Sequence, residues 1–124
     1  MSVRSRAHSH LRKAHQFLDS ARLSMDNELH DASASSAVLS GINSKDAICL
    51  ALTGSTGKSE DHSRAVQELR ESGPLGADLA PTFSQLLGLK TPSQYLAQQI
   101  PRPQAVKAIE WAQRMVEGAS SAFR

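Results

Sequence analysis

The chain has 124 residues, which suits one ordinary domain, and we expect a single domain over residues 1–124. Hydrophobic residues make up 40% and charged residues 21%, a globular rather than a disordered balance. No run of about 18 apolar residues occurs, so we expect no membrane segment. The basic start lacks the apolar stretch of a secretory signal. A single cysteine, Cys49, excludes an intrachain disulfide and favours a reducing, cytoplasmic location.

The net charge of +2 is unevenly distributed, because basic residues gather near the N-terminus. The cluster contains Arg4, Arg6, Arg12 and Lys13, together with His8, His10 and His15. Such a cluster can contact phosphate groups. No aromatic residue is interleaved with it, however, so we interpret residues 1–8 as a loose basic tail before a solvated first helical turn.

Two long helices are predicted in the first half of the chain. Apolar residues recur at steps of three and four from about Ser9 to Met25. A second helix is expected from about Asp31, a plausible N-cap, to Leu52. Its broad apolar face includes small residues that allow close contact with another helix, namely Ala34, Ala37 and Gly41. Because this face exceeds what one packing partner needs, we predict a homodimer.

Three shorter helices are predicted in the second half, after a loop at residues 53–59. The first spans about Glu60 to Ser72, with Gly73 suited to its C-terminal cap. The next spans about Leu79 to Leu89, with Pro81 in its first turn. Residues 91–103 hold three prolines and are predicted as a loop, and a last helix continues from there to about Ala119. Without β alternation, the fold class is an all-α bundle of about five helices.

Several motifs suggest chemistry without supporting it. The segment Gly54-Ser-Thr-Gly-Lys-Ser59 resembles a phosphate-binding loop, but Leu52 stands where that motif needs a glycine, and the segment follows a helix rather than a strand. The histidines have no partners at ligand spacing, so we predict neither a metal site nor a cofactor. Asp61 and His62 are interpreted as a capping pair. Cys49 lies among apolar residues and is predicted to be buried.

The order of these elements resembles that of HEPN domains, in particular the small stand-alone actinobacterial members. Four segments carry the resemblance: residues 35–52, the pair Asp61-His62, residues 83–95, and Ala108-Ile-Glu-Trp-Ala112. The resemblance implies a bundle of about five helices that is usually dimeric. It also implies a toxin–antitoxin system with a minimal nucleotidyltransferase as partner, and a metal-independent ribonuclease as the family activity.

The family motif is an arginine, four to six residues, and then a histidine, often followed by a tyrosine. In this sequence Lys90 stands at the arginine position, Gln94 at the histidine position, and Tyr95 follows. Gln94 cannot act as a general acid or base, and lysine lacks the bidentate fork of arginine. The resemblance therefore makes Lys90 and Tyr95 the candidate catalytic residues of a degenerate site. Lys90, Gln94 and Tyr95, with Asp46 and His62, are the candidate binding residues.

The segment from Leu89 to Tyr95 is the predicted functional centre. Pro92 and its polar neighbours should not continue the preceding helix. The resemblance implies that Tyr95 is the residue a partner nucleotidyltransferase would modify. In the architectural alternative, the Tyr95 ring packs on the last helix and Lys90 caps helix carbonyls.

Three functions remain open. The first is a dimeric HEPN-like module that binds a nucleotidyltransferase or RNA. The second is an active metal-independent ribonuclease that uses Lys90, Tyr95 and a nearby histidine such as His62. The third is a plain interaction bundle. The missing motif histidine favours the binding module over the active ribonuclease. The net positive charge, together with the resemblance, favours the binding module over the plain interaction bundle.

Overall fold

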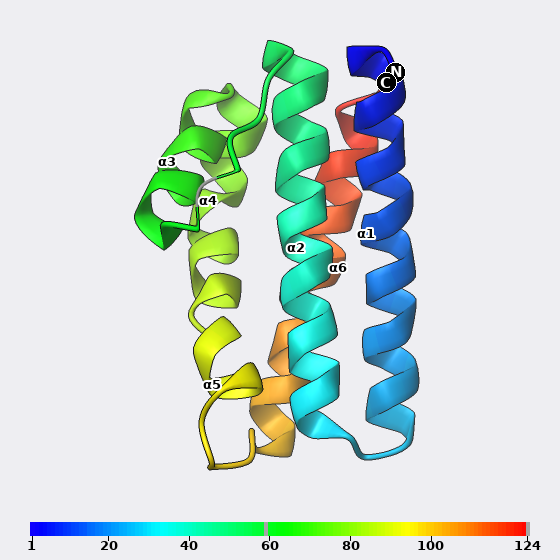
Figure 1. Ribbon diagram of the computed structural model, residues 1–124, viewed down its shortest axis with the longest axis vertical. Helices are drawn as coiled ribbons and strands as arrows, with labels where there is room; N and C mark the ends of the chain where they lie inside the picture. Colours follow the sequence, from blue (N-terminus) through cyan, green and yellow to red (C-terminus); the bar gives the residue numbers. More distant parts are fainter. Residues whose placement is uncertain (59, 124) are drawn as a thin grey trace.

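The computed structural model describes residues 1–58 and 60–123, and within them α-helix is the only regular secondary structure. Figure 1 shows the arrangement, which confirms the predicted all-α bundle of about five helices. Five helices have ten or more residues, and α5 is a single short turn. The elements in chain order are α1 (Val3–Asp26), α2 (His30–Thr53), α3 (His62–Glu71), α4 (Pro74–Leu87), α5 (Lys90–Gln94) and α6 (Arg102–Ser121).

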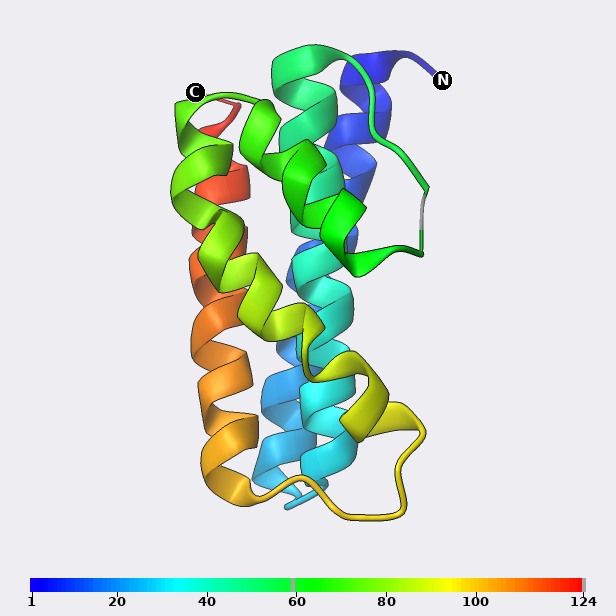
Figure 2. The same ribbon diagram turned by 90° about the vertical axis from the view of Figure 1, so that its left-hand side faces the viewer.

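Helix α2 lies at the centre of the bundle. It packs against α1 and α6, and also against α4 and α5 on another side. Figure 2 shows α4 running obliquely beside α6, with α3 packed alongside the first part of α4. Both chain ends lie at the same end of the bundle, and α5 lies towards the other end (Figure 1). None of the described helices combines the length and the apolar composition needed to cross a bilayer.

Small residues let α1 and α2 approach closely along their whole length. Two serines of α2 that the apolar pattern does not reveal are fully buried at this contact. Ser33 Oγ donates to the carbonyl of Ala21 at 2.8 Å, and Ser40 Oγ donates to the carbonyl of Ala14 at 2.7 Å. Each hydroxyl is satisfied by a spare lone pair of a helical carbonyl, so these polar groups are buried without the cost of an unpaired donor.

The apolar face of α2 is buried against other helices of the same chain. The prediction of a dimer from this face is therefore wrong. Ala34 and Ala37 have no exposed surface. A side chain at Gly41 would collide with the Leu86 side chain of α4. The face is broad because α2 has neighbours on several sides within one molecule.

Several helix starts differ from the predictions, and the first difference concerns the N-terminus. Residues 3–8 are helical rather than a loose tail, because Ser2 caps α1 by accepting from the Ser5 amide at 3.0 Å. Ala7 is fully buried, and the His8 ring lies 4.4 Å from that of Phe123 near the C-terminus. Packing between the two ends of the chain stabilises this first turn.

The second difference concerns α4, which begins at Pro74 rather than near Leu79. Gly73 is its N-cap at a φ of +139°, so this glycine starts α4 instead of capping α3. Pro81 therefore lies inside the helix rather than in its first turn. The extra turn is retained because it packs on α3, where Gly76 lies close to the carbonyl of Leu69.

The third difference concerns Asp31 and the segment before α6. Leu29 precedes α2 as its cap, whereas the Asp31 side chain accepts from the Ile100 amide at 2.8 Å. Residues 90–94, part of the predicted loop, form the turn α5. Pro92 is tolerated there because the first amides of a helix have no intrahelical partner.

Candidate functional site

A cavity of about 560 Å³ opens on the face where α2, α3, α4 and α5 meet the first half of α1. Its apolar lining comes from α2, α3 and α4. Its polar lining comes from α1, α2, α3 and α5, from Tyr95 at the end of α5, and from the loop between α2 and α3. The apolar residues are Ile42, Ala65, Phe83 and Leu87, and the polar ones include His10, Lys45, Asp46, Lys58, His62, Lys90 and Tyr95.

Four of the five predicted site residues line this one cavity. Asp46, His62, Lys90 and Tyr95 come from three helices and the residue that ends α5, and the fold brings them together. Gln94 is the exception. Its side-chain amide donates to Ser35 Oγ on α2 at 3.0 Å, and Gln94 is not part of the cavity lining.

The side chains of Lys90 and Tyr95 contradict the architectural alternative for this segment. Tyr95 is 73% exposed, so its ring does not pack on α6. Lys90 Nζ lies 3.9 Å from Glu60 Oε2, and the Glu60 side chain is 93% exposed. An ion pair this long and this exposed contributes little to stability. The Lys90 charge therefore stays accessible to a ligand.

His62 begins α3 and also lines the cavity. Asp61 caps this helix by accepting from the Arg64 amide at 3.3 Å, which confirms the capping interpretation. His62 Nε2 lies 3.3 Å from Ser84 Oγ on α4. A hydroxyl can donate or accept, so this contact is compatible with either imidazole tautomer.

A buried ammonium group, that of Lys45, is part of the cavity lining. The Lys45 side chain is 4% exposed, and its Nζ forms an ion pair with Glu68 and donates to Thr56 Oγ1 at 2.9 Å. Thr56 donates in turn to Asp46 Oδ1 at 2.6 Å. The Gly57 amide donates to Glu68 at 2.7 Å. These bonds hold the loop after α2 against α2 and α3.

The same network explains why the Gly-rich loop does not cradle phosphate. The Gly57 amide, a donor that such a loop would offer to a ligand, is taken by a carboxylate. Gly54 ends α2 in the left-handed conformation at a φ of +84°. The loop follows a helix, as expected for a helix-to-helix connection. Ser59, the last residue of the motif, lies outside the described residues.

Two pKa values respond to this environment. Burial raises the pKa of the Cys49 thiol to about 11; Lys45 opposes the rise, and Glu68 and Asp46 add to it. The thiol is therefore protonated at neutral pH and unsuited to nucleophilic attack, in line with the buried cysteine that was predicted. For Glu68, burial alone would raise the pKa, but hydrogen bonds from Lys45, Gly57 and Thr56 outweigh it and lower the pKa below 4.5.

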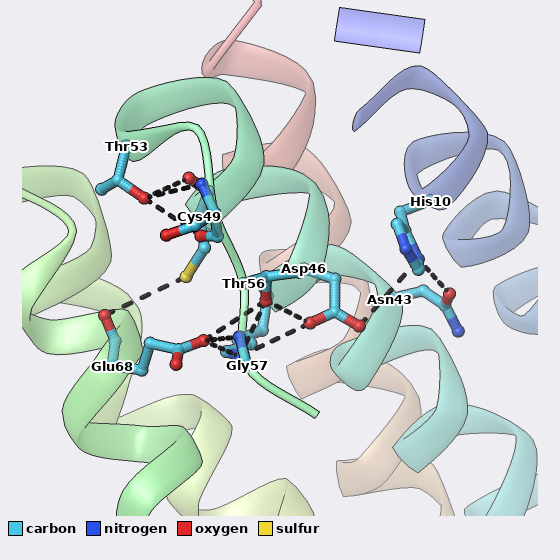
Figure 3. A network of polar contacts seen from close by, with 10 residues as sticks. His10, Asn43, Asp46, Cys49, Thr53, Thr56, Gly57 and Glu68 are labelled. Carbon is cyan, nitrogen blue, oxygen red and sulfur yellow. Dashed lines mark hydrogen bonds and ion pairs between the residues drawn. The ribbon is translucent and has the colours of Figure 1, made fainter. Parts of the chain in front are cut away.

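His10 is a site residue that sequence reasoning missed. It was assigned to the solvated start of the first helix, yet it lines the cavity. Its Nδ1 lies 2.9 Å from Asn43 Oδ1 and 3.9 Å from Asp46 Oδ2, both on α2 (Figure 3). The spacing of Asn43 and Asp46, three residues apart on one helix face, was the available signal for a shared partner.

The basic residues around His10 continue along α1. Arg6 and Lys13 lie one turn before and one turn after it and therefore neighbour it on the helix surface. Lys13 is exposed, and Arg6 is partly exposed. Because residues 3–8 are helical, these charges are held beside the cavity instead of moving on a tail.

The chain was compared with models of known protein families and with curated proteins, and neither comparison finds a match. Within the described residues, no three His, Cys, Asp or Glu side chains are grouped as a metal ion would require.

Proposed function

We propose that the protein is a HEPN-type module whose cavity binds single-stranded RNA, with a ribonuclease motif that has degenerated. In this proposal it acts in the cytoplasm as a homodimer, within a toxin–antitoxin system that includes a nucleotidyltransferase. The observation that carries the RNA-binding proposal is the exposed ring of Tyr95 beside the accessible charge of Lys90 on one cavity wall.

A solvent-exposed aromatic ring next to a cation suits single-stranded nucleic acid. Every base has a face that can stack on such a ring, and stacking contributes about 1–3 kcal/mol per base. The Lys90 ammonium can neutralise a neighbouring phosphate, and Arg6 and Lys13 extend the positive surface along α1. The carboxylates of Asp46 and Glu68 repel an RNA phosphate less than free carboxylates would, because the ammonium group of Lys45 already neutralises part of their charge.

The test is a pair of substitutions on this wall. Lys90→Glu and Tyr95→Ala should each weaken binding to a single-stranded RNA oligonucleotide about tenfold at low salt. The melting temperature should stay nearly constant, because neither side chain is buried. Lys107→Glu makes the same charge change on α6, away from the cavity lining, and should have little effect. If Lys107→Glu weakens binding as much as Lys90→Glu, the cavity is not the RNA site.

The proposed nucleotidyltransferase partner would act on the Tyr95 hydroxyl, which the resemblance implies as the acceptor. Exposure of this side chain supports access by an enzyme. Incubation with a minimal nucleotidyltransferase and a nucleoside triphosphate should add mass to the wild-type chain but not to Tyr95→Phe. Mass gained equally by Tyr95→Phe would exclude this residue as the acceptor.

An active ribonuclease is the second candidate, and the presence of His62 on the cavity of Lys90 and Tyr95 favours it. In that mechanism the imidazole would accept the proton of an attacking 2′-hydroxyl and Lys90 would stabilise the phosphate charge. We expect the purified protein, with a chelator present, to cleave RNA feebly or not at all, because Gln94 cannot transfer protons. Robust cleavage that is abolished by Lys90→Ala, Tyr95→Phe or His62→Ala would reverse this order of preference.

A further inference from the structure

The hydrogen bonds around His10 determine which of its two ring nitrogens carries the proton in the neutral ring. Asn43 Nδ2 donates to the carbonyl of Leu39 at 2.9 Å, which sets the orientation of the Asn43 amide. Asn43 Oδ1 therefore faces His10 Nδ1 at 2.9 Å, and an amide oxygen can only accept. His10 Nδ1 must be the donor. In the neutral ring, Nε2 then carries a lone pair and can only accept a hydrogen bond.

The charge of Asp46 favours the same tautomer of His10, with the proton on Nδ1. Asp46 Oδ2 lies 3.9 Å from Nδ1, too far for a direct hydrogen bond, but its negative charge favours a proton on the nitrogen that faces it. Asp46 is itself held by Thr56 and Lys45 through its other oxygen. Among the described residues, no group of the chain forms a hydrogen bond with His10 Nε2.

We propose that His10 determines the specificity of the cavity by accepting, at Nε2, a hydrogen bond from the ribose 2′-hydroxyl of a bound RNA. The inference rests on the RNA binding proposed above and adds how RNA is told from DNA. A phosphate oxygen has no proton to donate, so the neutral ring does not recognise phosphate. A ribose 2′-hydroxyl can donate, and deoxyribose lacks this group. Lys90, Arg6 and Lys13 remain for the phosphates.

Asparagine and glutamine separate the two nitrogens of His10 in an experiment. In His10→Asn the side-chain amide can replace Nδ1 and keep the bond to Asn43, but nothing accepts at the Nε2 position. In His10→Gln the longer side chain can place its oxygen near the Nε2 position. His15 is an exposed histidine on the same helix that does not line the cavity, so His15→Asn is the matched control.

The binding measurement uses RNA and DNA oligonucleotides of one sequence at mildly alkaline pH, where imidazole is neutral. His10→Asn should lower RNA affinity about fivefold, the loss of one neutral hydrogen bond, and leave DNA affinity unchanged. His10→Gln should recover part of the RNA preference, and His15→Asn should change nothing. Equal losses for RNA and DNA in His10→Asn, or no loss at all, would overturn the inference and leave RNA binding intact.

The tautomer is measured separately by long-range ¹H–¹⁵N NMR correlation on the unliganded protein. We expect the proton on Nδ1. A proton on Nε2 would make that nitrogen a donor and would overturn the inference whatever the protein binds. If the wild-type protein binds neither oligonucleotide, the proposed RNA binding is wrong. The proposed role of His10 in distinguishing RNA from DNA is then wrong as well.

Discussion

Lys45 shows how one buried charge organises the residues around it. An ammonium group removed from water costs several kcal/mol unless anions and hydrogen-bond acceptors replace the water. Glu68, Asp46 and Thr56 supply them, from α3, from α2 and from the loop that joins these helices. The loop lies along the cavity because Thr56 and Gly57 form hydrogen bonds with the Lys45–Glu68 ion pair.

Replacing Glu68 should destabilise the protein more than replacing an exposed acid. Breaking a fully buried ion pair costs about 3–5 kcal/mol. We expect about 2 kcal/mol for Glu68→Gln, because the carboxylate is 35% exposed and Asp46 still faces the ammonium. Urea unfolding measures the difference, with Glu117→Gln on α6 as the control. A loss no greater than that of the control would show that Lys45 does not depend on this partner.

Acid should act through the same carboxylate. The folded chain lowers the pKa of Glu68 below its ordinary value of 4.5, so the unfolded chain takes up the proton first. The stability contributed by Glu68 is present above pH 4.5 and is lost as the pH falls through that value towards the lowered pKa. Unfolding free energy measured against pH should decline less steeply in Glu68→Gln than in the wild type. Parallel curves would contradict this assignment.

At the scale of elements, the corner between α3 and α4 depends on two glycines. Gly73 turns the chain at a φ that other residues rarely adopt, and Gly76 then brings the first turn of α4 against the end of α3. A Cβ at Gly76 would collide with the Leu69 carbonyl and with Ser72 Oγ. This close approach sets the position of α4, which contributes Phe83 and Leu87 to the cavity.

Gly76→Ala should therefore be more harmful than Gly118→Ala. At Gly118 the new methyl group would meet the end of the Leu79 side chain, which can shift, whereas at Gly76 it meets backbone. Overpacking typically costs about 1–3 kcal/mol, and we expect about 2 kcal/mol for Gly76→Ala. Part of the loss at Gly118 is offset by the higher helix propensity of alanine. Thermal unfolding of the two variants decides the order, and equal melting temperatures would contradict it.

At the scale of the whole molecule, the proposed dimer needs a surface other than the small-residue face of α2. Leu96, which is 57% exposed, directly follows Tyr95, a cavity-lining residue, in the chain. Association of two chains through Leu96 would bring both copies of Lys90 to one groove. Their attractions for phosphate would then add together, and salt would screen them. The interface would thus build a longer RNA site from two short ones.

Light scattering at micromolar concentration should give twice the chain mass of 13.4 kDa. Leu96→Asp should give the mass of one chain, because a charge replaces an apolar contact. Leu52→Asp is the control, at an exposed leucine in the last turn of α2, near the opposite end of the bundle. A wild-type monomer would refute the dimer, and dissociation by Leu52→Asp alone would place the interface elsewhere.

Local patterns were sufficient for the fold class and for much of the core. Stripes at steps of three and four predicted α1 and α6, and Val66 and Leu69 are buried on α3 as expected. The cap at Asp61 and the end of α2 before Gly54 were also predictable. Each depends on residues a few positions apart, whose spacing on a helix is set by its 3.6-residue period.

The site depended on the tertiary structure at the points where the sequence interpretation failed. Nothing near Lys45 in sequence shows that Glu68 would neutralise it, and the start of α1 is stabilised by Phe123 at the other end of the chain. His10 lines the cavity and contacts Asn43 of α2, which is 33 residues away in the sequence. Sequence alone determined where the longer helices lie, though not where each begins, because their hydrogen bonds and periodicity are local. Only the packed bundle decided which charges meet, because those contacts join residues far apart in the chain.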